Sequence, residues 1–231
     1  MPMTKREISD VFFDLDHTLW DFDRNSRLAF QRVFIKYQID LEITEFLRVY
    51  EPINFNYWKL FREELVTKQE LRRGRLVDTF KCFKLKFSTE YIDDLAESYI
   101  DELPLNNYLF AGTEEILNYL SKKYSLHIIT NGFHKVQCLK LENSGIAKYF
   151  ETVTTSEEVG LKKPNPIIFK KALEKAIVHA HNSIMIGDTF EADILGAEAV
   201  GMQTLFYNYR KVVIPSKYIV VDSLDEIKNH L

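Results

Sequence analysis

The chain has 231 residues, of which 46% are hydrophobic and 28% are charged. These values are typical of a globular protein that buries a substantial core, as one large domain or as a domain with an insert. The net charge of −4 and the lack of a long basic run argue against a nucleic-acid partner. No apolar run approaches the roughly 20 residues that cross a membrane, and the N-terminus lacks the apolar segment of a secretory signal. We therefore expect a cytoplasmic protein, in which the isolated Cys82 and Cys138 are small buried thiols rather than a disulfide bridge.

The first predicted element is a buried strand over residues 8–14, and it ends in two closely spaced acids. Asp14 and Asp16 follow the apolar run Val11-Phe12-Phe13. Side chains alternate along a strand, so these two carboxylates point the same way if the extended geometry persists. Two crowded carboxylates repel each other unless they share a cation or a proton. The pattern predicts a metal site, an acid–base role, or both.

The pattern Asp-x-Asp-x-Thr also occurs in two other kinds of segment. Asp and Thr are also common at turns and helix N-caps, and that interpretation stays open on this segment alone. An EF-hand loop begins with a similar Asp-x-Asp-x-Thr pattern. It is excluded because Leu19 stands where that loop needs glycine and Asn25 where it needs glutamate.

The next part of the chain, from about Phe22 to Leu103, is helical in its apolar spacing. It contains a single glycine, Gly74, and a single proline, Pro52. After Pro104 short β-rich runs alternate with amphipathic helices, which predicts βαβ units and a parallel sheet. The predicted strands are residues 126–130, 152–155, 183–187 and 204–207; the predicted helices are 134–144, 166–177, 191–200 and a short one from 224.

We therefore predict an α/β fold, with a Rossmann-like core of residues 1–20 and 104–231 and an α-helical insert of residues 21–103. Ligands of open parallel sheets bind outside the carboxyl ends of the strands. Polar residues follow several of the predicted strands at that edge. They are Asp14 and Asp16, Thr130-Asn131-Gly132, Lys163-Pro164, and Gly187-Asp188 with Asp193.

The chemistry of this set favours phosphoryl transfer. Asp14, Asp16 and Asp188 offer the hard oxygen ligands that Mg²⁺ prefers. Thr130 and Lys163 offer donors for phosphoryl oxygens, and the backbone amides near Asn131 and Gly132 form a candidate anion nest. A carboxylate nucleophile beside a metal ion, with a lysine to balance charge, is suited to reaction through an aspartyl-phosphate.

The four motifs, in this order, resemble those of the haloacid dehalogenase superfamily. They are Asp14-x-Asp16-x-Thr18, Thr130, Lys163-Pro164 and Gly187-Asp188-x-x-x-x-Asp193. The resemblance implies that Asp14 is the nucleophile and a metal ligand. It implies that Asp16 protonates the leaving oxygen, then activates water, and binds the metal through its backbone carbonyl. Thr130 and Lys163 would hold the phosphoryl group.

The resemblance also implies a Mg²⁺ site that includes Asp188. Asp193 is included among the predicted metal-site residues. Its implied role is to orient the residues that ligate Mg²⁺ and not to bind the ion directly. The alternative for Asp193 is a carboxylate that stabilises a helix N-terminus, and the sequence leaves both open.

Asp16 separates the chemistries within this superfamily. An alkoxide leaving group needs a proton, whereas the halide expelled by a dehalogenase does not. Asp16 therefore favours a phosphatase, with a phosphomutase, a sugar-phosphate phosphatase or a phosphoglycolate phosphatase as alternatives. A catalytically inactive binding protein would have no reason to keep the five polar residues Asp14, Asp16, Thr130, Lys163 and Asp188.

The helical insert and the stretch after Thr130 resemble the house-cleaning pyrimidine 5′-nucleotidases. The stretch is Thr130-Asn131-Gly132-Phe133-His134-Lys135-Val136-Gln137, followed by Lys140-Leu141-Glu142-Asn143-Ser144-Gly145. The resemblance implies a helical cap over a nucleoside monophosphate substrate. The predicted substrate-binding residues are His17, Asn131, Gly132, Asn54, Trp58 and Arg75. The sequence does not predict the oligomeric state.

Overall fold

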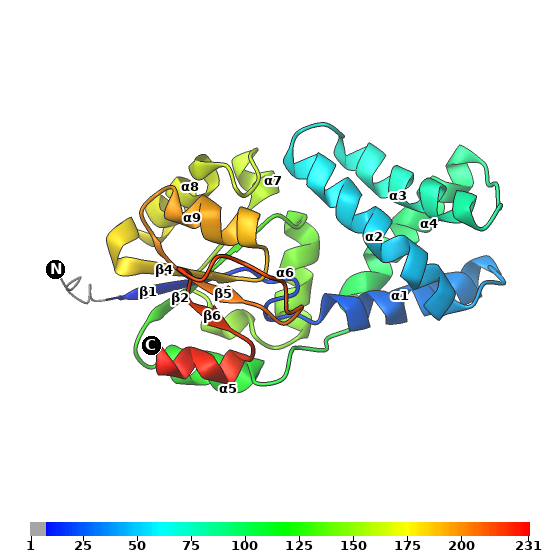
Figure 1. Ribbon diagram of the computed structural model, residues 1–231. Helices are drawn as coiled ribbons and strands as arrows, with labels where there is room; N and C mark the ends of the chain where they lie inside the picture. Colours follow the sequence, from blue (N-terminus) through cyan, green and yellow to red (C-terminus); the bar gives the residue numbers. More distant parts are fainter. Residues whose placement is uncertain (1–7) are drawn as a thin grey trace. The chain divides into compact units, whose positions relative to one another are not determined.

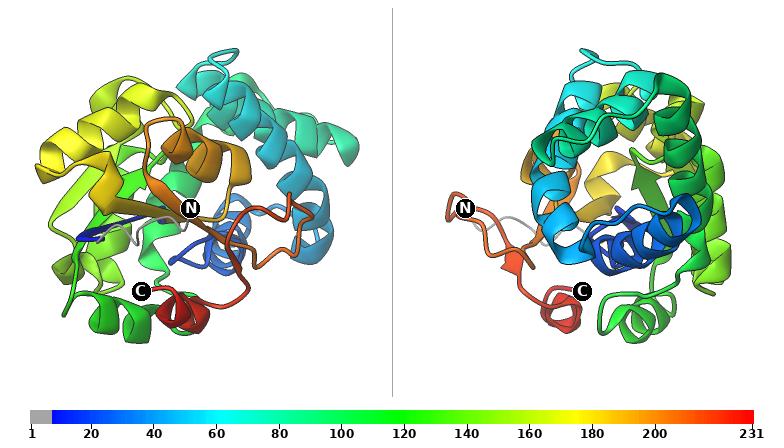
Figure 2. Two further views of the ribbon diagram at one scale, coloured as in Figure 1. Left: turned by 60° about the vertical axis from the view of Figure 1, so that its left-hand side comes forward. Right: turned by 90° about the vertical axis from the view of Figure 1, so that its right-hand side faces the viewer.

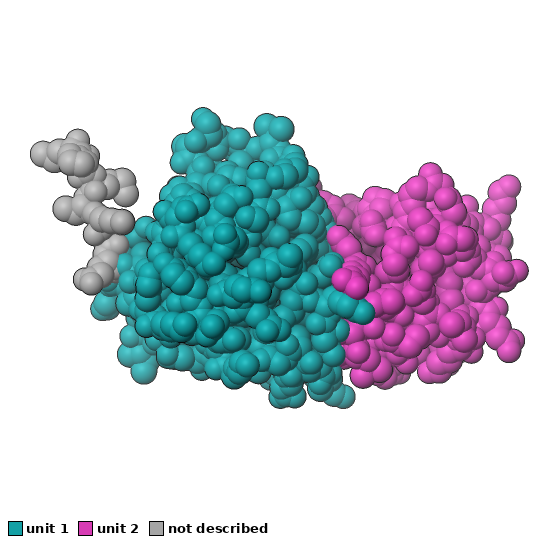
Figure 3. All heavy atoms as spheres, turned by 90° about the horizontal axis from the view of Figure 1, so that it is seen from below, with its two compact units in different colours: residues 1–22, 107–231 teal, residues 23–106 magenta. Residues whose placement is uncertain are grey.

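The computed structural model describes residues 8–231. These form two compact units, one of residues 8–22 and 107–231 and the other of residues 23–106 (Figure 3). The first unit contains the sheet, and the second is helical. Among the described residues, no helix combines the length and the apolar character needed to cross a membrane. Both cysteines are free thiols, as predicted, but the expectation that they are buried is wrong: Cys82 is exposed and Cys138 is partly exposed.

The sheet has six parallel strands in the order β3-β2-β1-β4-β5-β6. The strands are β1 (Asp10–Phe13), β2 (Ser125–Thr130), β3 (Thr152–Thr155), β4 (Ser183–Gly187), β5 (Gln203–Tyr207) and β6 (Val220–Val221). The predicted parallel α/β sheet is confirmed. All four residues of β1 are buried, as expected for a central strand covered on both faces. Strand β6 was not predicted, because two residues are too short to show a period.

Helices cover both faces of this sheet (Figure 1). On one face lie α8 (Pro166–Ala176) and α9 (Gly196–Glu198), and on the other lie α5 (Thr113–Leu120) and η5 (Leu224–Asn229). Helix α8 begins with Asn165, whose side chain accepts from the Ile167 amide, and with Pro166 in the first turn. The core between sheet and helices on the α8 side consists of Phe12, Ile129, Ile168, Phe169, Ala172, Leu173, Met185, Ala197 and Met202.

The remaining elements of this unit connect the strands. They are α6 (His134–Asn143), η2 (Ala147–Tyr149), α7 (Ser156–Val159), η3 (Ala180–Asn182) and η4 (Phe190–Leu195). The helix predicted over residues 191–200 is interrupted, because η4 is a π-helix that continues into the short α9. Single π-helical turns are frequent at functional sites.

The second unit contains four helices and a short 3₁₀ segment. They are α1 (Phe22–Tyr37), α2 (Ile43–Arg62), α3 (Lys68–Cys82), α4 (Thr89–Glu102) and η1 (Leu103–Leu105). Their starts follow local rules: Thr67 and Glu70 form a capping box before α3, and Ser88 caps α4. Figure 2 shows these helices packed against one another.

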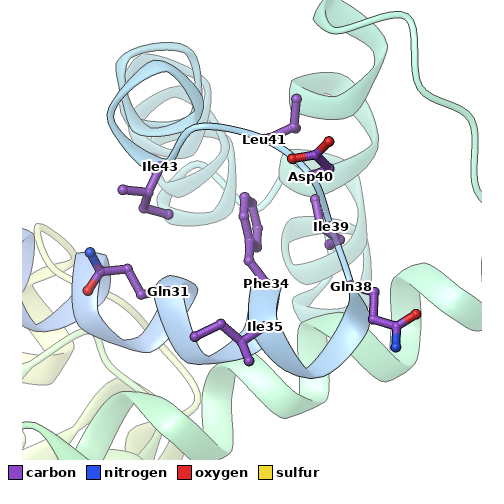
Figure 4. Close-up of a pocket in the computed structure, with 8 residues that line it drawn as sticks. All are labelled: Gln31, Phe34, Ile35, Gln38, Ile39, Asp40, Leu41 and Ile43. Atoms are coloured by element: carbon purple, nitrogen blue, oxygen red, sulfur yellow. The ribbon is translucent and has the colours of Figure 1, made fainter.

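An aromatic cluster forms the core of the helical unit. The ring of Phe30 stacks on Tyr99 with centroids 4.1 Å apart and meets Phe46 and Tyr50 edge-on. Nearby, the end of α1 and the start of α2 border a hollow into which Phe34 projects (Figure 4). The hollow is lined by Gln31, Phe34, Ile35, Gln38, Ile39, Asp40, Leu41 and Ile43.

Truncating the centre of this cluster is expected to destabilise the protein strongly. Phe30 is fully buried, whereas 55% of Phe55 is exposed. We predict that Phe30→Ala lowers the free energy of unfolding by about 3–5 kcal/mol, because it removes apolar contacts and leaves a cavity. Phe55→Ala is the matched control and should change it by less than about 1 kcal/mol. Chemical denaturation checks both; equal losses would contradict this description of the core.

Candidate active site

The ends of three neighbouring strands bring the polar residues together. In the sheet register Phe13 of β1 lies level with Ile128 of β2 and Ile186 of β4. Asp14, Thr130 and Asp188 follow these residues by one or two positions. Because the strands are parallel, these side chains lie at one edge of the sheet, at the carboxyl ends of its strands.

The buried ammonium group of Lys163 lies at the centre of this set. Its Nζ is 2.8 Å from Asp14 Oδ1 and 2.7 Å from Asp193 Oδ1. It also donates to the backbone carbonyl of Ile129 at 2.7 Å. Burial disfavours the charged lysine, but the adjacent Asp14 and Asp193 carboxylates outweigh burial and raise the pKa of Lys163. Lys163 therefore carries a fixed positive charge beside Asp14.

Asn131 holds the backbone of Lys163 in place. Its Oδ1 accepts from the Lys163 amide at 2.7 Å, and its Nδ2 donates to the Lys163 carbonyl at 3.0 Å. The Ser156 hydroxyl in turn donates to the Asn131 carbonyl at 3.1 Å. The side chain of Asn131 thus links the end of β2 to the segment that carries Lys163. A direct contact of Asn131 with substrate stays a prediction.

Three carboxylates form a compact acidic cluster beside Lys163. One oxygen from each of Asp14, Asp188 and Asp193 lies within 4.8 Å of the others. Burial, opposed by Lys163 and assisted by Asp193, raises the pKa of Asp14 to about 7. Burial and the charges of Asp193 and Asp14 raise the pKa of Asp188 well above its ordinary value. Asp188 accepts no side-chain hydrogen bond within residues 8–231. Crowded hard oxygen donors of this kind fit a divalent cation.

Asp193 has two partners that fix its orientation. Its Oδ2 accepts from the Thr189 amide at 2.9 Å, while its Oδ1 faces Lys163. Gly187 makes this arrangement possible, because a Cβ at that position would overlap the Asp193 carboxylate. The hydrogen bond from the Thr189 backbone amide is what a carboxylate at a helix N-terminus would accept. The ion pair with Lys163 is what a residue that orients the site would form. The two alternatives left open by the sequence are therefore compatible.

Helix α6 contacts two of the predicted catalytic residues. Gln137 Nε2 donates to Thr130 Oγ1 at 2.8 Å and to Asp16 Oδ2 at 3.0 Å. Lys140 Nζ donates to Asp16 Oδ1 at 2.6 Å. The Gly132 amide also donates to Thr130 Oγ1, at 3.1 Å. The hydroxyl of Thr130 thus accepts two hydrogen bonds and keeps its own hydrogen to donate.

His17 lies against the segment that follows β5. Its Nδ1 is 2.8 Å from the Tyr209 hydroxyl and 3.1 Å from Arg210 Nη2. Arg210 Nη2 also lies 3.5 Å from His17 Nε2, so both ring nitrogens face the guanidinium. Burial, together with Arg210 and Lys140, lowers the pKa of His17 well below its ordinary value. His17 is therefore a neutral imidazole at neutral pH.

Two of the substrate-binding residues predicted in the helical unit form a hydrogen bond with each other. Arg75 Nη1 donates to Asn54 Oδ1 at 2.8 Å, and the guanidinium lies over the rings of Tyr50 and Tyr99. Arg75 is only 2% exposed. Trp58 lies on α2 and packs edge-on against Phe61. Substrate contact by Asn54, Trp58 and Arg75 stays a prediction.

Gln137 and Lys140 belong to the site, although neither is part of the four sequence motifs. The sequence does contain a signal for them. The buried face of α6 consists of Val136, Gln137, Lys140 and Leu141. An amphipathic helix would carry apolar side chains at all of these positions, so a glutamine and a lysine there indicate buried polar partners.

The fold and this site define a hydrolase of known type. Residues 11–207 match the family described as haloacid dehalogenase-like hydrolases, which is most of the chain. The chain belongs to this family, and both the expected family and the expected hydrolase activity class are confirmed.

The chain is also similar to individual members of this family. The chain is 34% identical over 199 residues to the pyrimidine 5′-nucleotidase YjjG of Escherichia coli (strain K12), covering 86% of this chain and 85% of the relative. It is 31% identical over 200 residues to the pyrimidine 5′-nucleotidase PynA of Streptococcus pneumoniae (strain ATCC BAA-255 / R6), covering 86% and 83%. The magnesium-bound structure of the HAD-hydrolase YfnB from Bacillus subtilis is similar with a TM-score of 0.89 and 26% identity, covering 97% and 99% of the two chains.

The raised pKa of Asp188 makes a prediction about stability. A carboxyl group whose pKa is higher in the folded than in the unfolded state binds more protons when folded. Its contribution to stability is therefore lost as the pH rises from the unfolded pKa, near 4, through the folded one. We predict that Asp188→Asn raises Tm at pH 8 in the presence of a chelator. The expected increase is about 2–4 °C for each kcal/mol gained in the free energy of unfolding, and it should shrink toward pH 5.

Thermal unfolding at both pH values checks this, with Asp94→Asn as the control for an exposed carboxylate. A gain that does not depend on pH, or a loss of stability at pH 8, would contradict the account of the acidic cluster.

Proposed function

We propose that the protein is a Mg²⁺-dependent phosphomonoester hydrolase that acts through an aspartyl-phosphate on Asp14. The observation that carries this proposal is the ion-paired cluster at the sheet edge. It joins a buried lysine to a carboxylate of raised pKa, with a second acid, Asp16, two residues further along the chain. These are the parts that covalent phosphoryl transfer requires.

Mg²⁺ would be held by Asp14, Asp188 and the backbone carbonyl of Asp16. When bound, it would neutralise charge on the phosphoryl oxygens. Asp193 would act from behind these residues by orienting Lys163. The contacts that support this are its ion pair with Lys163 and its hydrogen bond from the Thr189 amide.

In the first half of the reaction Asp14 attacks phosphorus. Its Oδ1 faces Lys163, which leaves Oδ2 to form the new P–O bond. As the bond to the leaving oxygen breaks, Asp16 in its acid form gives that oxygen a proton. Thr130 donates its hydroxyl hydrogen to a phosphoryl oxygen, and Lys163 supplies the balancing positive charge.

In the second half water attacks the phosphorus of the aspartyl-phosphate. Asp16, now a carboxylate, accepts a proton from that water. The bond between phosphorus and Asp14 breaks, inorganic phosphate leaves, and Asp14 and the protonated Asp16 are restored. The same acid thus serves both steps, which is why a second acid is needed beside the nucleophile.

The proposed substrates are pyrimidine nucleoside 5′-monophosphates. Support comes from the pyrimidine nucleotidase activity in the names of two relatives at 34% and 31% identity. The helical unit would contribute the nucleoside contacts, through Asn54, Trp58 and Arg75. A screen of nucleoside monophosphates, hexose phosphates and phosphoglycolate with Mg²⁺ tests the assignment. UMP, dUMP and dTMP should be hydrolysed fastest, and activity should disappear with chelator.

Results of that screen distinguish the alternatives. If the protein hydrolyses sugar phosphates but not nucleotides, the proposed substrate is wrong and the proposed phosphatase activity stands. Transfer of the phosphoryl group to a second sugar rather than to water would indicate a mutase. Full activity without a divalent cation would overturn the proposed metal site.

Replacing the nucleophile should abolish turnover without unfolding the protein. Asp14→Asn is nearly isosteric, but its amide cannot attack phosphorus. We predict that kcat falls by several orders of magnitude, while the circular dichroism spectrum is unchanged. Asp94→Asn is again the control for the substitution itself. Near-normal turnover by purified Asp14→Asn would contradict the covalent mechanism.

A further inference from the structure

Among the described residues only two lysines are buried, Lys140 and Lys163. Lys163 has a place in the proposed reaction. Lys140 lies on α6, and no step of that reaction uses it. A buried charge requires a strong local partner, because taking it out of water costs several kcal/mol.

The surroundings of Lys140 enclose its ammonium group. Its Nζ lies 2.6 Å from Asp16 Oδ1, and the side chain is 2% exposed. The same atom lies 4.2 Å from the ring centre of Trp20 and 5.2 Å from that of Phe22, both distances suited to cation–π contact. Asp16 is thus the carboxylate toward which this lysine is directed.

Gln137, one turn earlier on α6, holds the other oxygen of Asp16. Its Nε2 donates to Asp16 Oδ2 at 3.0 Å and to Thr130 Oγ1 at 2.8 Å. Gly132 leaves room for this side chain, because a Cβ there would overlap it. Both oxygens of Asp16 are therefore held by one helix face, and the carboxylate has a fixed orientation.

A merely structural pair is a weak explanation for this arrangement. Well-packed apolar residues often stabilise a protein as well as a buried ion pair does. Proton transfer, by contrast, depends steeply on position, and a misplacement of about 1 Å can cost about 10²-fold in rate. The contacts of Lys140 act on the one residue that the proposed mechanism uses for proton transfer.

We propose that Lys140 and Gln137 are positioning residues that hold Asp16 for proton transfer to the leaving oxygen and from the attacking water. The proposal rests on the proposed phosphatase function. It places neither residue on the phosphoryl group. It therefore separates their effect from that of Lys163, whose loss would slow phosphoryl transfer to Asp14 from every substrate, whatever its leaving group.

The test compares two substrates that differ in their need for a proton. The variants are Lys140→Met and Gln137→Leu; Lys135→Met, at an exposed position of the same helix, is the control. With UMP we expect Lys140→Met to lower kcat on the order of 10²-fold. KM and the inhibition constants of orthovanadate and inorganic phosphate should stay within about threefold of wild type, because phosphoryl binding is intact.

With p-nitrophenyl phosphate the leaving group needs no proton, so phosphorylation of Asp14 should stay fast. Water activation would still be slow, and rapid mixing should show a burst of p-nitrophenolate equal to the enzyme concentration. Lys140→Arg keeps a cation and its donors and should recover part of the UMP activity. Gln137→Leu should show the same dependence on leaving group as Lys140→Met.

Other results would overturn the proposal. Equal losses of the rate of Asp14 phosphorylation with both substrates, together with weaker inhibition by orthovanadate, would make Lys140 a phosphoryl-binding residue. Wild-type kinetics in folded Lys140→Met would remove any role, and if that variant does not fold, Gln137→Leu carries the same test. A wild-type protein without phosphatase activity would instead overturn the proposed function.

Discussion

The ion pairs of the buried Lys163 ammonium constrain the rest of this site. They join three segments that are far apart in the sequence: the end of β1 with Asp14, the loop after α7 with Lys163, and η4 with Asp193. Removing Lys163 would leave these two carboxylates in the interior without their cation, and breaking a buried ion pair in this way typically costs about 3–5 kcal/mol. The parallel sheet brings the segments to one edge, and the ion pairs fix their side chains. The proposed nucleophile is therefore oriented before any substrate binds.

The same edge of the sheet holds more negative charge than one lysine balances. The pKa of Asp14 rises to about 7 and that of Asp188 rises as well, so ionising these groups costs free energy in the folded protein. Such crowding lowers stability, yet it is the condition under which a divalent cation binds well. We infer that the stability lost at neutral pH is regained when a cation binds. Stability and the proposed activity thus oppose each other at Asp188.

Much of this arrangement is predictable from the sequence, for a physical reason. Asp14, Thr130 and Asp188 each follow a β-rich run directly, so strand direction alone brings them to one edge. Strand β6 could not be predicted, because Val220-Val221 is too short to show a period. The contacts of Gln137 and Lys140 with Asp16 could not be predicted either, since they depend on how α6 packs in three dimensions. The pairing of Arg75 with Asn54 is likewise a tertiary contact between two helices.

The central claim is that Asp14 forms a covalent bond to phosphorus, and peptide mapping of a trapped enzyme tests it most directly. Wild-type protein with Mg²⁺ is mixed with UMP and quenched in acid within milliseconds, and its peptides are examined by mass spectrometry. The account predicts a phosphoryl group, labile to hydroxylamine, on the peptide that contains Asp14. The Asp14→Asn protein should lack it. Turnover of UMP with the phosphoryl group on another residue, or with none on the peptide containing Asp14, would contradict the account.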